Sequence, residues 1–136
     1  MRRDSVDRFM KLFQGYQQAH GQYRVQKREA DGKMSGRAVT VSEAATKEHF
    51  ESHLKGGDYI LGIIMLKDDN SCNFGVIDID IRGEVKLKDT LDELEKKIQD
   101  TPLVMCRSKS GGAHLYLFCE PAIAAIDIVS KLNEFA

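Results

Sequence analysis

Two continuous apolar runs in the middle of the chain constrain its fold more than any other feature. They are YILGIIML, residues 59–66, and CNFGVIDIDI, residues 72–81, joined by the polar turn KDDNS. Runs of this length are too short to cross a membrane as helices, and their β-branched residues favour buried strands. We therefore expect two buried strands that lie next to each other in one sheet.

The segments after residue 72 predict the rest of that sheet. Segment 87–99 has apolar residues at helical spacing and ends before a proline at 102. Strands are expected at LVMC and AHLYLFC, residues 103–106 and 113–119, and a closing helix from about Pro121 to Phe135. This order predicts an RRM-like sheet, of the split βαβ or ferredoxin-like kind, without its last strand. The missing strand indicates a truncated product or a fragment of a longer protein.

The first part of the chain predicts a smaller subdomain. An amphipathic helix is expected over residues 5–18, with Ser5 as its N-cap, and strands over residues 22–25 and 37–41. Thr46 is a suitable N-cap for a second helix that ends at about Leu54, before Gly56. The predicted fold class is therefore α+β, with an N-terminal α/β subdomain at residues 1–57 and an incomplete RRM-like subdomain at 58–136.

Composition excludes several classes of protein. With 42% hydrophobic and 30% charged residues, the chain resembles ordinary globular proteins rather than disordered ones. Cys72, Cys106 and Cys119 lack CxxC spacing and lie in apolar runs, which predicts reduced core residues of an intracellular protein. No membrane span or signal peptide is indicated, so a cytoplasmic protein is expected.

Because the net charge is −1, any nucleic-acid binding must come from local basic clusters. One lies at residues 24–37, which equally fits a solvated loop, and another at 107–109.

The acidic pair in VIDIDI is the first candidate site. The two-residue period of a strand places Asp78 and Asp80 on one face and the isoleucines on the other. Adjacent carboxylates repel each other, and a hard divalent cation such as Mg²⁺ relieves that repulsion. We interpret the pair as a metal site for phosphoryl transfer. Two alternatives stay open: an edge strand that merely alternates Asp with Ile, and the start of a haloacid-dehalogenase-type phosphatase.

The turn RSKSGGAH, residues 107–114, is the second candidate site. Its glycines would let backbone N–H groups approach an anion, and its hydroxyl and basic side chains would bind phosphate oxygens. The candidate phosphate-binding residues are Arg107, Ser108, Lys109, Ser110, Gly111, Gly112 and His114. An ordinary hairpin loop is the alternative.

Two further histidines have the spacing of metal ligands on a helix. His49 and His53 are four residues apart, but the residue directly after His49 is not the glutamate of an HExxH motif. No cysteine pair is near. Packing or surface roles are therefore expected for both.

In combination, the two candidate sites resemble the archaeo-eukaryotic primase superfamily. The shared pattern is an apolar strand with DxD, followed about thirty residues later by an RS-x-SG-x-xH hairpin. The stretches RFMKLFQGY, HLKG and DDNSCNFGVIDID are similar to its primase-polymerase branch in mobile-element and defence systems, the TOTE-type primase domain. The resemblance spans about residues 9–118.

This resemblance implies a function and a set of site residues. Asp78 and Asp80 would bind catalytic Mg²⁺ or Mn²⁺, and Ser108 and His114 would contact the phosphates of an incoming nucleoside triphosphate. The implied activity is primer synthesis or extension of DNA or RNA on a single-stranded or primed template. Helicase, nuclease or reverse-transcriptase modules of the same system are implied partners. No association with a membrane is implied.

One family feature is missing from the sequence. The family uses a third metal-binding carboxylate after the second motif, whereas Asp127 and Glu134 both fall in the predicted last helix. We expect the third carboxylate beyond Ala136. A non-catalytic module that binds nucleotides or single-stranded nucleic acid, and a DxD phosphatase, remain the rival functions.

Overall fold

The computed structural model describes residues 3–28, 30, 34–81, 87–108 and 111–136. Its elements, in chain order, are α1 (Arg3–Leu12), β1 (His20–Arg28), β2 (Met34–Val41), α2 (Lys47–Leu54), β3 (Ile60–Gly62), β4 (Ser71–Ile79), α3 (Leu87–Ile98), β5 (Val104–Arg107), β6 (Ala113–Ala124) and α4 (Ala125–Phe135). The predicted α+β class is confirmed. None of the helices in these ranges is long and apolar enough to span a membrane.

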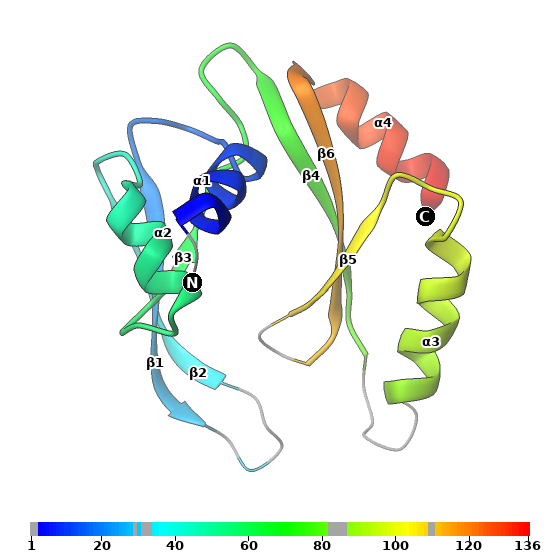
Figure 1. The fold of residues 1–136 in the computed structure, drawn as a ribbon, viewed down its shortest axis with the longest axis horizontal. Helices are drawn as coiled ribbons and strands as arrows, with labels where there is room; N and C mark the ends of the chain where they lie inside the picture. Colours follow the sequence, from blue (N-terminus) through cyan, green and yellow to red (C-terminus); the bar gives the residue numbers. More distant parts are fainter. Residues whose placement is uncertain (1–2, 29, 31–33, 82–86, 109–110) are drawn as a thin grey trace.

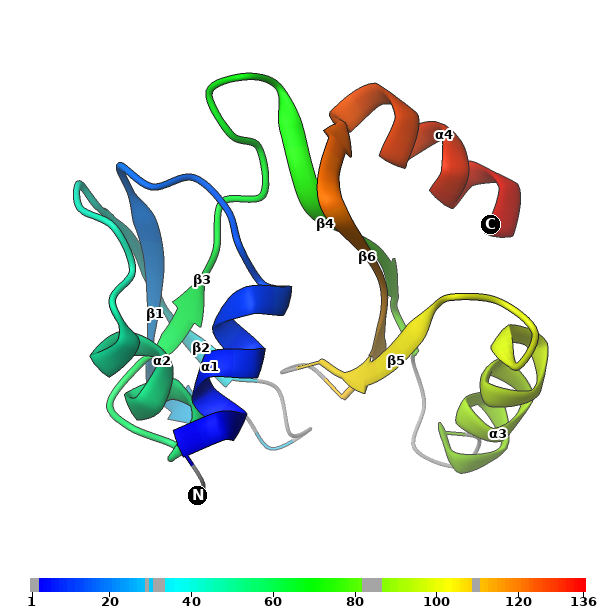
Figure 2. The same cartoon turned by 45° about the horizontal axis from the view of Figure 1, so that its top comes forward.

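The strands form two antiparallel sheets. The first has the order β2-β1-β3 and the second the order β4-β6-β5. Figure 1 shows α1 and α2 with the first sheet on one side of the second sheet, and α3 and α4 on its other side. The turned view in Figure 2 shows the same arrangement. The second sheet therefore has one face toward the N-terminal elements and one toward the last two helices.

The face toward α3 and α4 holds the hydrophobic core of the second sheet. Leu115 and Leu117 of β6 are buried there together with Leu103. The side chains packed around them come from the strands and both helices: Ile77, Ile79, Leu94, Ile98, Met105, Cys119, Leu132 and Phe135. The period of two along β6 sends His114, Tyr116 and Phe118 to the opposite face.

That opposite face is joined to the N-terminal elements by aromatic packing. Phe13, just after α1, makes edge-to-face contacts with Phe74, Tyr116 and Phe118, each with ring centroids 5.1 Å apart. Edge-to-face pairs are favoured because the positive ring edge meets the negative ring face. Phe13 therefore anchors the N-terminal segment on the second sheet.

Helix α2 begins where its capping residue predicts. Thr46 accepts a hydrogen bond from the backbone N–H of His49, and the His49 side chain reaches back to the Thr46 backbone N–H. This is a capping box with histidine in the place usually taken by Glu or Gln. Gly56, with a φ of 73°, follows the helix in a backbone conformation that favours glycine.

The expected neighbour of β4 was wrong. Of residues 59–66, only Ile60–Gly62 form a strand, and it pairs with β1 through Gly21 opposite Gly62. A Cβ added at Gly62 would lie 3.4 Å from the Gly21 Cα, so two glycines meet where the backbones come close. Strand β6 takes the place beside β4 that the sequence assigned to this segment.

Three other local expectations were also wrong. Helix α1 starts before Ser5 and ends at Leu12, because the chain then turns so that Tyr16 N–H donates to the Ile64 carbonyl at 2.8 Å. The last helix starts at Ala125 rather than near Pro121, because β6 stays paired with β4 up to Ala124. Of the three free cysteines, Cys72 is buried, but Cys106 is exposed on β5 and is not a core residue.

Candidate functional site

A cleft of about 620 Å³ lies between the N-terminal elements and the second sheet. One wall is polar and carries four side chains from the predicted sites together with a tyrosine: Asp78, Arg107, Ser108, His114 and Tyr116. The other wall is largely apolar and comes from α1, α2 and the β3 segment, including Phe9, Phe50, Ile63 and Met65. The chain therefore brings one of the two predicted acids and three residues of the predicted turn motif to one concave surface.

Asp78 and His114 are direct neighbours across the sheet. They are paired residues in the β4–β6 register, and His114 Nε2 lies 3.4 Å from Asp78 Oδ1. The Asp78 side chain is 73% exposed and that of His114 is 32% exposed. The carboxylate is therefore open to a ligand, while the imidazole is held by its surroundings.

Tyr116 holds the other side of the His114 ring. Its hydroxyl lies 3.1 Å from His114 Nδ1, and the two rings meet edge to face. Burial raises the pKa of Tyr116, and the nearby Cys106 and Asp78 raise it further. The phenol therefore stays protonated at neutral pH and can donate to Nδ1. In that arrangement the proton of a neutral His114 is on Nε2, directed at Asp78.

Asp80 shares the alternation of β4 but not the cleft. Asp78 and Asp80 are exposed whereas Ile77 and Ile79 pack on the core, as the strand period predicts. Asp80 follows the end of β4 and is not among the described residues that line the cleft.

Two backbone N–H groups of the turn after Arg107 form hydrogen bonds within the turn itself. Ser108 N–H donates to the Gly112 carbonyl, and Gly111 N–H donates to the Ser108 carbonyl, each at 3.1 Å. These two N–H groups are therefore not available for a phosphate in this conformation, contrary to the expected backbone cradle. Anion binding at this turn would rest on side chains instead, chiefly those of Arg107, Ser108 and His114. Lys109 and Ser110 lie outside the described residues.

The backbone geometry explains why both positions 111 and 112 of the turn are glycine. Gly111 has a φ of 89°, a conformation that side chains disfavour. A Cβ at Gly112 would lie 2.3 Å from the Ile79 carbonyl oxygen, so only glycine fits there without a backbone shift. The close approach of Gly112 to Ile79 holds the turn beside the acidic end of β4.

Asp78 and Asp80 have the chemistry to hold part of a divalent metal site. Both are exposed carboxylates, and carboxylate oxygens are preferred ligands of Mg²⁺ and Mn²⁺. Within the described ranges, no group of three or more His, Cys, Asp or Glu side chains is placed to hold a metal ion. Asp127 and Glu134 lie in α4, and neither is among the described residues of the cleft wall. The pair would therefore share a metal with water or phosphate oxygens.

His49 and His53 have separate roles rather than a common ligand. The Nδ1 atom of His49 accepts the Thr46 backbone N–H at 2.9 Å, and that of His53 accepts the Leu61 backbone N–H at 3.1 Å. His49 also lies 4.6 Å, centroid to centroid, from the ring of buried His20. His53, in contrast, lines the cleft.

Sequence reasoning missed three residues of this region. Tyr116 lies two residues after His114 on the same strand face, so the strand period could have identified it. Phe13 carried no signal beyond its place on a helical apolar face. His53 was expected to pack or to lie on the surface, and its place on the cleft wall depends on how α2 and β3 meet.

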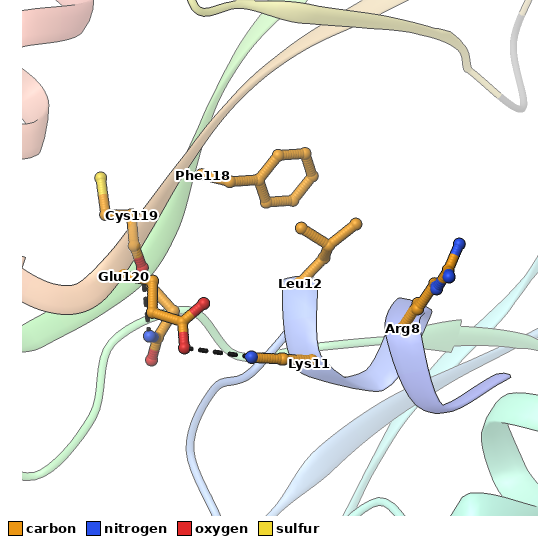
Figure 3. Close-up of a pocket in the computed structure, with 7 residues that line it drawn as sticks. Arg8, Lys11, Leu12, Phe118, Cys119 and Glu120 are labelled. Atoms are coloured by element: carbon orange, nitrogen blue, oxygen red, sulfur yellow. Dashed lines mark hydrogen bonds and ion pairs between the residues drawn. The ribbon is translucent and has the colours of Figure 1, made fainter. Parts of the chain in front are cut away.

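A second, smaller cavity lies beside α1 (Figure 3). Its volume is about 340 Å³, and it lies between Arg8 and Leu12 of α1 and Phe118 of β6. Lys11 Nζ and Glu120 Oε1 form an ion pair of 3.3 Å at its edge. None of the described residues predicted to bind metal or nucleotide lines this cavity, so it is distinct from the candidate site.

Comparison with known proteins places both motifs in one family. The model for the archaeo-eukaryotic primase domain of TOTE conflict systems matches residues 4–134. No curated protein sequence matches the chain. The match includes β4, the turn and β6, and therefore every residue of the candidate site.

Proposed function

This chain belongs to the archaeo-eukaryotic primase domain family of TOTE conflict systems, and from that premise we propose that its cleft binds a metal–nucleoside triphosphate complex for nucleotidyl transfer. The product would be a primer, or an extended DNA or RNA strand, made on a nucleic-acid template. The observation that carries this proposal is the convergence of Asp78, Arg107, Ser108 and His114 on one cleft.

Each polar residue has a role that its chemistry supports. Asp78 and Asp80 would hold Mg²⁺ or Mn²⁺, which when bound neutralises phosphate charge and makes a hydroxyl easier to deprotonate. Arg107 and Ser108 would hold the triphosphate oxygens, with Lys109 and Ser110 as further candidates. His114 would donate from Nε2 to a phosphate oxygen next to the metal, once Asp78 binds the metal and releases that N–H.

The geometry of His114 supports its role as a donor. Asp78 and Tyr116 contact its two ring nitrogens, at 3.4 and 3.1 Å. Because the Tyr116 hydroxyl holds Nδ1, the ring loses little rotational freedom when Nε2 turns from Asp78 to a phosphate, which strengthens binding. The proposed division into residues 1–57 and 58–136 would split the apolar wall between the two subdomains and place the polar wall on the second. The β1–β3 pairing adds residues 60–62 to the first sheet.

A non-catalytic binding module is the second candidate function. It is favoured by the finding that the described residues contain no cluster of three potential metal ligands. Such a module would use the same cleft to bind nucleotides or single-stranded nucleic acid without joining them. Helicase, nuclease or reverse-transcriptase modules remain proposed partners in either case.

Calorimetry with paired acidic variants tests the metal and nucleotide site. Asp78→Ala combined with Asp80→Ala should weaken Mg²⁺-dependent nucleoside triphosphate binding about tenfold or more, because charged ligands to the complex are lost. Asp92→Ala removes an exposed acid of α3 and serves as the control. Unchanged binding by the double variant would reject the site.

Primer synthesis separates the two functions. The 136-residue chain is incubated with labelled nucleotides, a single-stranded template and Mg²⁺ or Mn²⁺. Labelled product that disappears in the double variant supports the polymerase. The same result rules out the non-catalytic module, because such a module binds nucleotides without joining them.

A further inference from the structure

We propose that His53 is a nucleobase-recognition residue, whose Nε2–H donates to a carbonyl oxygen or ring nitrogen of the bound base. This inference rests on the proposed function, since it names the base subsite of the same cleft. His53 lies on α2, and Asp78 and His114 lie on β4 and β6, yet all three line one cleft of about 620 Å³. The cleft therefore has a second recognition group on the wall that the two motifs do not supply.

One backbone hydrogen bond determines which nitrogen of His53 carries the proton. The Leu61 N–H can act only as a donor, and it lies 3.1 Å from His53 Nδ1. Nδ1 must therefore accept, and a neutral ring then carries its proton on Nε2. Within the described residues, the structure records no hydrogen-bond partner for Nε2. This nitrogen is thus a donor of defined identity in a cleft-lining side chain.

The surroundings keep His53 neutral and limit its motion. Burial lowers the pKa of His53 below its ordinary value, so the imidazole is uncharged at neutral pH. Its ring lies 6.2 Å, centroid to centroid, from that of Phe9, at an interplanar angle of 36°. The aromatic and aliphatic side chains around this donor carry no positive charge to hold a phosphate, whereas Arg107 lies on the other wall of the cleft.

The same wall suits a flat, weakly polar base. Phe9, Phe50, Ile63 and Met65 line the cleft with His53 and offer apolar surface for ring contact. Every nucleobase carries hydrogen-bond acceptors on its edge. One donor would therefore favour binding of a base without distinguishing one base from another. The polar wall with Arg107, Ser108 and His114 is left for the triphosphate. The two walls would therefore recognise the two ends of one nucleotide.

Two substitutions separate the structural bond from the proposed donor. His53→Asn keeps an oxygen near the position of Nδ1 for the Leu61 N–H, but it is too short to replace Nε2. His53→Gln places an amide N–H near the position of Nε2. Both variants are compared with the wild-type chain by thermal unfolding, to show that they fold.

Binding is measured by calorimetry with three Mg²⁺-bound probes: a nucleoside triphosphate, an abasic ribose triphosphate and inorganic tripolyphosphate. His53→Asn should weaken nucleoside triphosphate binding by about three- to tenfold, the effect of losing one hydrogen bond, and should leave the other two within about twofold. His53→Gln should restore much of the loss. An equal loss for abasic ribose triphosphate would assign the donor to the sugar and overturn base recognition.

Other outcomes distinguish the failure of this inference from failure of the proposed function. If wild-type protein binds tripolyphosphate and nucleotide but His53→Asn changes neither, the inference alone is wrong. If wild-type protein binds no probe, the proposed function fails and the inference fails with it. Should His53→Asn not fold, NMR on the wild-type chain decides. The His53 ring signals should shift with nucleoside triphosphate but not with tripolyphosphate, and their failure to do so rejects the inference.

Discussion

His114 and Asp78 stand opposite each other in the β4–β6 register, with His114 Nε2 3.4 Å from Asp78 Oδ1. A hairpin turn and an acidic strand that are distant in the sequence thus present one histidine–carboxylate unit to the cleft. The ladder places the two Cα atoms opposite each other, so the two side chains can meet across the strand pair.

Replacing His114 should weaken the binding of every triphosphate probe. His114→Ala removes a donor from the phosphate wall, so Mg²⁺-bound nucleoside triphosphate and tripolyphosphate should both bind about tenfold more weakly. Calorimetry with the same probes measures this, and His53→Asn is the contrast because only nucleotide binding should change there. A loss confined to the nucleotide would contradict the assignment of His114 to phosphate.

Removing the Tyr116 hydroxyl should act through His114. Tyr116→Phe keeps the edge-to-face contact with Phe13 but removes the hydroxyl 3.1 Å from His114 Nδ1. Nucleotide affinity should fall by about three- to tenfold, and the NMR ring signals of His114 should move, while the unfolding temperature changes little. Tyr16→Phe is the matched control. It removes a hydroxyl that donates to the Gln18 side chain, and neither Tyr16 nor Gln18 is among the described residues of the cleft wall. Unmoved His114 signals would exclude this positioning role.

Loss of the Phe13 ring should loosen the N-terminal elements from the second sheet. Phe13→Ala should lower the free energy of unfolding by about 2–3 kcal/mol, because the ring contacts three aromatic side chains of the second sheet but is only partly buried. Leu12→Ala, at a side chain that is 44% exposed, should cost less than about 1 kcal/mol. Urea unfolding measures both, and equal effects would show that the aromatic contacts do not join the two parts.

The stability of the chain should depend on the protonation of His53. Because burial lowers the folded-state pKa of His53, the unfolded state binds more protons at pH values below about 6.5. The stabilisation from neutral His53 is therefore present above that pH and is lost as pH falls through the folded pKa. Urea unfolding between pH 7.5 and 5 should show a steeper loss for wild-type protein than for His53→Gln. Parallel curves would mean that His53 titrates alike in both states.

Local pattern predicted much of the chemistry-bearing structure. The period of a strand is enough to place Asp78 with Asp80, and Ile77 with Ile79, on opposite faces, and the structure confirms that alternation. Thr46 predicted the start of α2, because an N-cap acts within one turn of the helix. The family was also predicted correctly, since its two motifs are short and each is contiguous in the chain.

Pairing between distant segments could not be predicted in the same way. The run at residues 59–66 has the pattern of a strand but does not specify a partner, and the structure pairs Ile60–Gly62 with β1 rather than with β4. The Gly-rich turn was expected to offer its backbone to an anion, but Ser108 and Gly111 use their N–H groups within the turn. Such choices depend on competition among hydrogen-bond partners, which a sequence pattern does not rank.

The α+β class, the family and the two motifs could be predicted from the sequence, because they depend on local periodicity and on residues close together in the chain. The support of His114 by Tyr116, and the place of His53 in the same cleft as Asp78, became clear from the folded structure alone. Those relationships depend on how separate elements pack, and packing is a collective choice of the whole core rather than a property of any one segment.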